Sequence, residues 1–143
     1  MSYFVTGGTG FIGRFLIGNL LKRKGSIHVL VRQASMKKFD AMVKKQGWDP
    51  KRVIAVPGDM TAANRGLSAA QVRALAGKVQ HFFHLAAIYD LTASAAEQQA
   101  ANIDGTRHAL DLAAALKVKC FHHASSIAAA GLYPGVFRED MFD

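Results

Sequence analysis

The sequence predicts an α/β fold, an open and doubly wound parallel sheet with helices on both faces. Five short apolar segments of strand length alternate along the chain with four longer segments whose apolar residues recur at helical spacing. The strand-like segments are almost continuously apolar, which is typical of strands covered on both faces of a parallel sheet. A glycine-rich turn at residues 7–13 joins the first strand to the first helix. Right-handed crossovers then place the strands in the order 3-2-1-4-5.

The first half of the chain contributes three strands and two helices. An apolar strand at residues 3–5 leads through the glycine turn into a helix, for which Gly25 is a natural C-cap. Residues 27–31 form the second strand. Residues 35–46 carry an apolar stripe at helical spacing, and residues 53–56 form the third strand.

The second half contributes two more helices and two strands. Ser68 is a plausible N-cap for a helix that ends at Gly77, and residues 81–87 form the fourth strand. The alanine-rich stretch 94–116 favours a long helix by propensity, with Ile103, Leu110, Ala113 and Ala114 expected on its buried face. Residues 120–124 form the fifth strand.

Length and composition indicate one folded domain, residues 1–143. Half of the residues are apolar, no apolar run approaches the ~18 residues that a membrane span needs, and Cys120 is the single cysteine. We therefore expect a cytoplasmic protein without stable membrane insertion. Residues 1–52 carry a net charge of +9 and the remainder −1. Because no nucleic-acid-binding motif accompanies this charge, we interpret it as a solvated surface and expect no nucleic-acid partner.

The glycine turn has the context of a dinucleotide site, since it follows a strand and opens a helix. Gly7 and Gly8 can take a positive φ in a tight turn, Gly10 lets the backbone approach a pyrophosphate, and Gly13 lets helix and strand pack closely. The helix that starts there points its free N–H groups at the phosphates. The predicted coenzyme-binding residues of this stretch are Gly7, Thr9, Gly10, Phe11, Ile12, Gly13 and Arg14.

The end of the second strand favours NADP(H) over NAD(H). A site for NAD usually has an acid at this strand end that binds the ribose 2′-hydroxyl, but this chain has no acid before Asp40. Arg32 occupies the strand end, and Arg14 follows the last glycine. Two guanidinium groups near the adenosine ribose favour a 2′-phosphate.

Further candidate residues follow the other strands. In a Rossmann-type sheet the ligand binds beyond the carboxyl ends of the strands. Asp59 follows the third strand, Ala86 and Ala87 end the fourth, and Ser126 follows the fifth. These scattered residues are therefore expected at one edge of the sheet.

With these residues assembled, the chain resembles the extended short-chain dehydrogenase/reductase superfamily. The resemblance rests on five segments in the family order: Thr6–Gly13, Gly58–Thr61, His84–Ala87, Asn102–Thr106 and Ser125–Ser126. It adds Met60 and Leu85 to the residues expected to line the coenzyme. Within the superfamily, the chain is most similar to the fatty acyl-CoA and thioester reductase branch, with nucleotide-sugar epimerases and dehydratases as the alternative.

The resemblance implies NADPH-dependent hydride transfer to an acyl thioester, such as a fatty acyl-CoA, or to a long-chain aldehyde. Ser126 would donate a hydrogen bond to the reacting carbonyl oxygen, and Asn102 would position a helix kink or a water in the proton relay. Family members often pair through helices that include the one around Asn102, which makes a homodimer an expectation.

The family also uses a Tyr-x-x-x-Lys pair, which this sequence lacks. Tyr3, Tyr89 and Tyr133 are each followed four positions later by a residue other than lysine. We therefore expect these 143 residues to be the amino-terminal, coenzyme-binding portion of a longer enzyme, with the remaining strands and the substrate-binding part beyond residue 143. The alternative is a non-catalytic NADP-binding sensor module.

No metal site is expected from the six histidines. His81 with His84, and His122 with His123, fall on predicted strands, where neighbouring side chains point to opposite faces. Neither pair has a common metal-ligand spacing with the cysteine or with acids. These histidines are interpreted as residues of the core or its rim.

Overall fold

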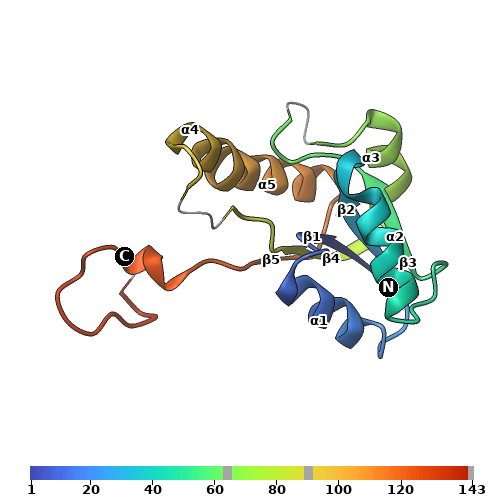
Figure 1. Ribbon diagram of the computed structural model, residues 1–143, viewed down its shortest axis with the longest axis horizontal. Coiled ribbons are helices and arrows are strands. Elements are labelled where there is room, and N and C mark those ends of the chain that lie inside the picture. The colour runs from blue at the N-terminus through green and yellow to red at the C-terminus, as the bar shows by residue number, and fades with distance from the viewer. Residues whose placement is uncertain (63–65, 89–91, 142–143) are drawn as a thin grey trace.

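The computed structural model describes residues 1–62, 66–88 and 92–141. Tyr89 and the chain end at 142–143 lie outside these residues. Five parallel strands form one sheet in the order β3-β2-β1-β4-β5, as the sequence predicts (Figure 1). The strands are β1 (Ser2–Thr6), β2 (Ser26–Val31), β3 (Val53–Pro57), β4 (Val79–His84) and β5 (Cys120–His123). The helical elements are α1 (Phe11–Leu20), η1 (Gln33–Ser35), α2 (Met36–Lys45), α3 (Ala69–Leu75), α4 (Ala95–Gln98), η3 (Gln99–Asp104), α5 (Gly105–Ala115) and η4 (Ile127–Ala130).

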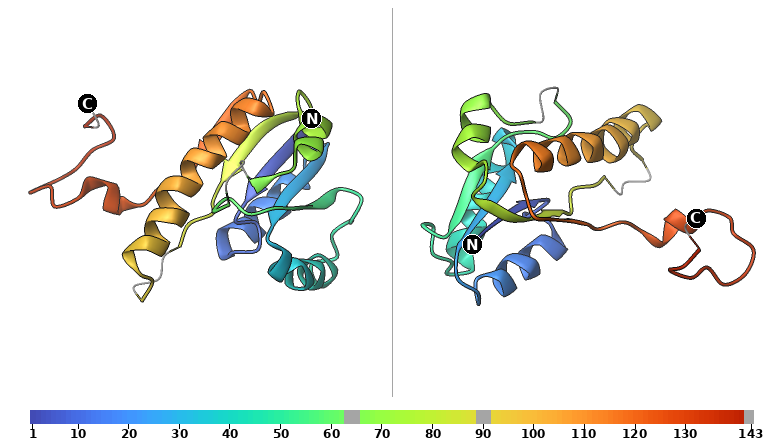
Figure 2. Two further views of the ribbon diagram at one scale, coloured as in Figure 1. Left: turned by 90° about the horizontal axis from the view of Figure 1, so that it is seen from above. Right: turned by 180° about the vertical axis from the view of Figure 1, so that it is seen from behind.

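Helices cover the sheet on both faces. Figure 1 and the right-hand view of Figure 2 show α1 on one side of the sheet and α5 on the other. On the α1 side, Ile17 and Phe39 pack with strand residues such as Val29. On the α5 side, Leu112 packs with residues such as Phe82. Because consecutive strand residues point to opposite faces, nearly continuous apolar strands supply both cores.

The alanine-rich helix forms as predicted, but it is not α-helical throughout. Ser94 caps it through a capping box with Glu97, and α4, η3 and α5 follow one another, with η3 being π-helical. Its buried residues include Ala109 and Leu112, whereas Ile103 and Leu110 are 47% and 49% exposed. Ala113 is buried as predicted, but the buried face predicted for Ile103, Leu110 and Ala114 was wrong. Ile103 lies within the π-helical segment, whose wider turn shifts the angular positions of its own residues and of those that follow.

The fourth strand is shifted relative to the prediction, since β4 begins at Val79 and ends at His84. Residues 85–87 follow β4 at the carboxyl ends of the strands and are not part of its pairing with β5, which ends at His84. After β5 the chain runs away from the sheet, and both views of Figure 2 show this segment extending to one side. None of the helices in the described ranges is long and apolar enough to span a bilayer.

Candidate functional site

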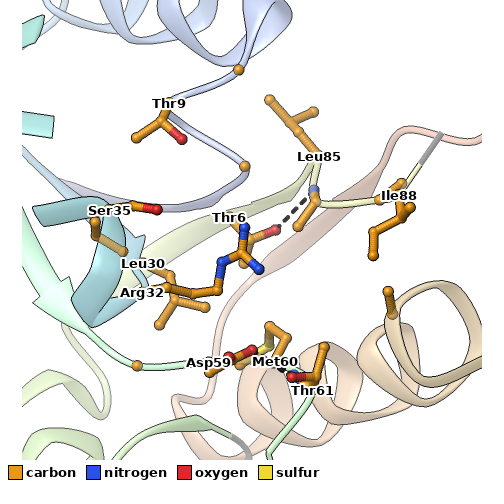
Figure 3. A pocket seen from close by; sticks show the side chains of 17 residues that line it. Thr6, Thr9, Leu30, Arg32, Ser35, Asp59, Met60, Thr61, Leu85 and Ile88 are labelled. Atoms are coloured by element: carbon orange, nitrogen blue, oxygen red, sulfur yellow. Dashed lines mark hydrogen bonds between the residues drawn. The ribbon is translucent and has the colours of Figure 1, made fainter. Parts of the chain in front are cut away.

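A pocket of about 280 Å³ opens at the carboxyl ends of β1, β2, β3 and β4 (Figure 3). Nine of the residues that line it were predicted from the sequence: Gly7, Thr9, Gly10, Arg32, Asp59, Met60, Leu85, Ala86 and Ala87. The others were not among the predicted site residues, and these are Thr6, Leu30, Val31, Ser35, Gly58, Thr61, Ile88 and Ala101. Parallel strands end at the same edge, and this topology brings residues from four distant segments into one pocket.

The packing of the glycine turn against the rest of the chain requires glycine at several positions, and Gly13 itself does not line the pocket. Gly7 has a φ of 70°, and a Cβ there would lie 2.7 Å from the carbonyl carbon of Leu85. A Cβ at Gly13 would lie 2.4 Å from the Gly7 carbonyl oxygen, which is closer than any side chain tolerates. Gly8 does not share the positive φ of Gly7. It is needed for another reason, because a Cβ there would meet Val29 at 2.5 Å.

Helix α1 starts directly after this turn, with Gly10 as its N-cap. No side chain caps it, and its first turn contains no acid. The first N–H groups of a helix have no acceptor within the helix, so this end offers free donors and a positive dipole to an anion. Phe11 and Ile12 do not line the pocket, and their side chains are 71% and 62% exposed, so only their backbone N–H groups are placed at this helix end.

The two arginines proposed for the 2′-phosphate lie in different places. Arg32 follows β2, and its side chain extends into the pocket with Ser35 beside it in the lining (Figure 3). Within the described residues, its guanidinium makes no hydrogen bond or ion pair, which leaves its donors available to an anion. The Arg14 guanidinium instead lies over the ring of Phe11, 5.9 Å from the ring centroid, and does not line the pocket. The structure therefore does not bring Arg14 together with Arg32.

Asp59 and Met60 lie across the pocket from the glycine turn. The Asp59 carboxylate accepts from the backbone N–H and the hydroxyl of Thr61, at 2.9 and 2.8 Å. His108 on α5 donates from Nδ1 to the Met60 carbonyl oxygen at 2.6 Å. These contacts hold the loop after β3 against α5.

Asn102 holds the segment after β4 instead of pointing a free amide into the pocket. Its Oδ1 accepts from the Ile88 N–H at 2.9 Å, and its Nδ2 donates to the Ile88 carbonyl at 3.0 Å. Asn102 lies within the π-helical segment, and its role in a helix kink or a proton relay stays a prediction. Both hydrogen-bonding ends of its side chain are used by one backbone position, and they tie the segment after β4 to the helix that contains Asn102.

A chain of hydrogen bonds runs from Thr6 at the end of β1 through His84 to Thr106 on α5 and the Asn102 carbonyl on η3. The His84 residue is 1% exposed. Thr6 Oγ1 lies 2.8 Å from His84 Nδ1, and His84 Nε2 lies 3.3 Å from Thr106 Oγ1. Thr106 Oγ1 donates to the Asn102 carbonyl at 2.6 Å. Because that carbonyl only accepts, the Thr106 oxygen accepts from His84 Nε2–H. Nδ1 is then the acceptor of the Thr6 hydroxyl, and His84 is the neutral Nε2–H tautomer.

The surroundings of His84 keep it neutral. Burial, and to a smaller degree the charge of His123, lower the pKa of His84 from 6.5 to about 4. Thr6 Oγ1 also accepts from the Ala86 N–H at 3.2 Å, so its own hydrogen is directed to His84. A proton on Nδ1 would remove the acceptor of that hydrogen. The sequence indicates His84 only as the first residue of the His84–Ala87 motif. It does not indicate the hydrogen bond to Thr106, because the two residues are 22 positions apart along the chain.

Ser126 lies on the segment after β5 and does not line the pocket. Its Oγ accepts from the Ala128 N–H at 3.2 Å and thereby caps η4. This contact uses a lone pair of the oxygen, so the hydroxyl hydrogen stays available to donate. The side chain is exposed to solvent.

These features fit a nicotinamide dinucleotide. The glycine turn lines the pocket with the backbone of Gly7 and Gly10, the first turn of α1 provides uncapped donors for a pyrophosphate, and Arg32 provides a cation without a partner among the described residues. Asp59, Met60 and residues 85–87 provide the walls between which the rest of such a ligand would lie.

Comparison with known proteins identifies a family and several proteins that are similar to this chain. Residues 5–143 match the family described as "Male sterility protein". A linear gramicidin synthase from Brevibacillus parabrevis is 36% identical over 132 residues, which cover 86% of this chain and 3% of that protein. A Drosophila melanogaster protein named "Putative fatty acyl-CoA reductase CG8303" is 31% identical over 129 residues, which cover 80% of this chain and 23% of that protein.

Among solved structures, the terminal R domain from the myxalamid PKS-NRPS biosynthetic pathway superposes with a TM-score of 0.80 and 27% identity. The superposition covers 94% of this chain and 37% of that domain. The chain thus spans less than two-fifths of the length of each of these three proteins.

Proposed function

The chain belongs to the "Male sterility protein" family, in agreement with the reductase branch that its motifs indicate, and from that premise we propose that it is the coenzyme-binding portion of an NADPH-dependent reductase. The proposed substrate is an acyl thioester such as a fatty acyl-CoA, or a long-chain aldehyde. When bound, the coenzyme supplies the hydride that reduces the substrate carbonyl. The chain's own residues bind the coenzyme, orient it and stabilise charge on the carbonyl oxygen.

The observation that carries the choice of NADPH is the unpaired Arg32 in the pocket lining. A guanidinium at the end of the second strand can make two parallel hydrogen bonds to a phosphate, and the neighbouring Ser35 hydroxyl can donate a third. Among the described residues of the lining, Asp59 is the one acid. It follows β3, the strand paired with β2, and its carboxylate accepts two hydrogen bonds from Thr61.

The proposed substrate rests on the kinship with a protein named as a fatty acyl-CoA reductase and on the hydroxyl of Ser126. Hydride transfer to a carbonyl builds negative charge on its oxygen, and a donor aimed at that oxygen stabilises the transition state. The Ser126 O–H is available for this role, because the cap of η4 uses only its oxygen. Asn102 acts as a positioning residue through its two hydrogen bonds to Ile88.

Isothermal titration calorimetry with NADPH and NADH tests the coenzyme. We expect NADPH to bind at least ~10-fold more tightly, which corresponds to about 1.4 kcal/mol. Arg32→Asp should abolish or reverse this preference. Arg14→Asp makes the same charge change outside the pocket and should keep it. Equal affinities for the two coenzymes in the unmodified chain, or an unchanged preference in Arg32→Asp, would contradict the proposal.

The reaction is tested on the enzyme that contains this portion, by following NADPH oxidation with a fatty acyl-CoA and with a fatty aldehyde. Ser126→Ala should lower kcat by about 100-fold while the affinity for NADPH stays unchanged. Ser125→Ala is the matched control and should have little effect. A lack of NADPH oxidation with both substrate classes would remove the substrate part of the proposal and leave the coenzyme part standing.

We also propose that the chain forms a homodimer through the helix around Asn102. Ile103 and Leu110 lie seven positions apart, about two helical turns, and are 47% and 49% exposed. Two copies would bury this apolar pair. Sedimentation velocity should give a dimer that Leu110→Lys converts to a monomer, and a concentration-independent monomer for the unmodified chain would contradict the idea.

A further inference from the structure

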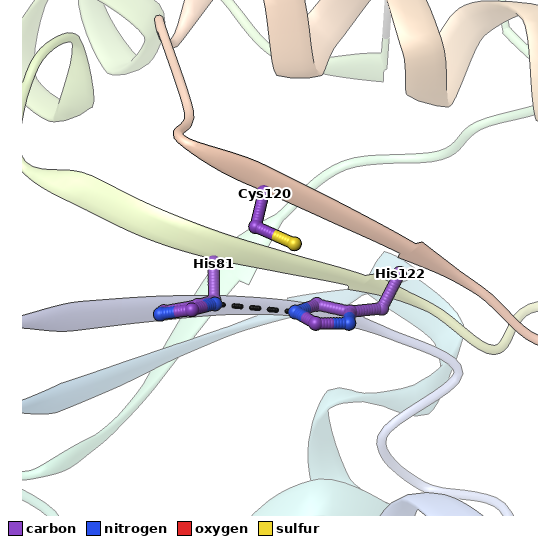
Figure 4. Close-up of side chains that lie close together, drawn as sticks. All are labelled: His81, Cys120 and His122. Atoms are coloured by element: carbon purple, nitrogen blue, oxygen red, sulfur yellow. Dashed lines mark hydrogen bonds between the residues drawn. The ribbon is translucent and has the colours of Figure 1, made fainter.

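A second group of chemically active side chains lies outside the pocket, on strands β4 and β5. His81 Nδ1 and His122 Nε2 are 3.1 Å apart, and the ligand atoms of His81, Cys120 and His122 all lie within 4.8 Å of one another (Figure 4). Sheet register creates this group. His81 is directly opposite Cys120, and His122 lies two positions beyond Cys120 and therefore on the same face. That face is the α1 side, because His81 is also opposite Tyr3, which packs in the α1 core.

We propose that His81, Cys120 and His122 bind a Zn²⁺ ion, with the fourth position open to water. Zinc takes four ligands in a tetrahedral arrangement, with Zn–N of about 2.0–2.1 Å and Zn–S of about 2.3 Å. These values place two nitrogen ligands ~3.4 Å apart and nitrogen and sulfur ~3.6 Å apart. The observed separations therefore need ligand shifts of at most ~1 Å, which side-chain rotation supplies. Imidazole and thiolate donors without a carboxylate favour zinc over calcium or magnesium.

The neighbouring rings hold the two imidazoles in place. The Phe83 ring stacks on His122 with centroids 4.3 Å apart and an interplanar angle of 7°, and Tyr3 stacks on His81 at 5.9 Å. All three residues are only half-buried, so an ion can reach them.

The proton balance of binding is simple. In the metal-free state, one of the two nitrogens at 3.1 Å donates its proton to the other. Zinc takes the lone pairs of both, so the donor imidazole shifts its proton to its other ring nitrogen. The Cys120 thiol loses its proton to solvent and forms the Zn–S bond. The bound ion would link β4 and β5, the two strands that supply its ligands.

Titration with Co²⁺, monitored by absorbance, tests the site because cobalt in a zinc site reports its ligands. We expect one ion per chain, tetrahedral ligand-field bands, a thiolate-to-cobalt charge-transfer band, and displacement of all of these by Zn²⁺. Cys120→Ser should abolish the charge-transfer band. His122→Gln should weaken binding at least ~10-fold, since even loss of a residue that only supports a ligand costs that much.

His123→Gln is the matched control. It is adjacent in sequence, but its side chain lies on the opposite face, with its ring 5.4 Å from that of His84. It should keep the spectrum and the affinity. A cobalt complex without the charge-transfer band, or equal losses in the His122 and His123 variants, would overturn the assignment. Far-UV circular dichroism of the metal-free variants shows whether they are folded, and zinc should raise the melting temperature of the unmodified chain but not that of Cys120→Ser.

Discussion

Replacement of His84 by glutamine tests the chain of hydrogen bonds that links Thr6 on β1, His84 and Thr106 on α5. Glutamine does not titrate, and its side chain cannot reach both Thr6 and Thr106 with the geometry of an imidazole. At pH 7.5 the variant should lose about 1–3 kcal/mol of unfolding free energy, because a buried hydroxyl loses its partner.

The pH dependence gives the sharper result. The folded-state pKa of His84 is lowered to about 4 from 6.5. The stabilisation from the neutral imidazole is therefore fully present above pH 6.5, and it falls as the pH decreases toward 4. Between pH 7.5 and pH 5 the unmodified chain should lose about 2 kcal/mol through this residue alone. The variant should not show that loss, so the stability difference between the two proteins should decrease by about 2 kcal/mol between pH 7.5 and pH 5.

Urea unfolding followed by circular dichroism at several pH values measures both curves. Subtraction removes the contribution of the carboxylates, which the two proteins share. His123→Gln removes the imidazole stacked near His84 but keeps the hydrogen bonds, and it should retain most of the slope. Nitrogen NMR on the unmodified chain should show the Nε2–H tautomer of His84 and no protonation above pH 5.

Parallel curves for the unmodified chain and the His84→Gln variant between pH 7.5 and 5 would refute the reasoning. So would an Nδ1–H tautomer, because Thr6 would then be the acceptor and the direction of the whole chain of bonds would reverse.

Gly13→Ala places a Cβ 2.4 Å from a carbonyl oxygen of the turn and should weaken NADPH binding at least ~10-fold in calorimetry, whereas Gly18→Ala in the same helix, whose nearest atom would be 4.0 Å away, should leave affinity unchanged. Asn102→Ala removes both hydrogen bonds to Ile88 and should cost about 1–3 kcal/mol in urea unfolding, with faster amide exchange at residues 85–88. Ser94→Ala removes a capping box and should cost ~1 kcal/mol.

For each of these three variants, one outcome would contradict the structural interpretation. Equal affinities in the two glycine variants would mean that the turn tolerates a side chain. Unchanged exchange at residues 85–88 in the Asn102 variant would mean that the segment is held by other contacts. No loss of stability in Ser94→Ala would show that the first turn of α4 does not depend on its cap.

The strand order and the coenzyme edge could be derived from the sequence alone. Strand and helix periodicity, the glycine turn and the handedness of crossovers are properties of short segments, and together they leave one topology. The same logic found Arg32 and Asp59, because each directly follows a strand and parallel strands end at one edge.

Tertiary structure decided which side chains meet. Arg14 and Arg32 were both candidates in the sequence, with Arg32 the stronger because it ends the second strand. The structure places the Arg14 guanidinium over the Phe11 ring and Arg32 in the pocket lining. Local propensity favoured an unbroken helix around Asn102, and the bonds to Ile88 that accompany its π-helical turn come from another segment.

The histidines also show the difference between what the sequence determines and what only the tertiary structure decides. His81 and His122 are 41 positions apart, and only the register between β4 and β5 brings them within 3.1 Å of each other. Sequence spacing describes neighbours along one strand, whose side chains point to opposite faces. Neighbours across strands depend on how the whole sheet aligns, and that alignment depends on the packing of every helix against it.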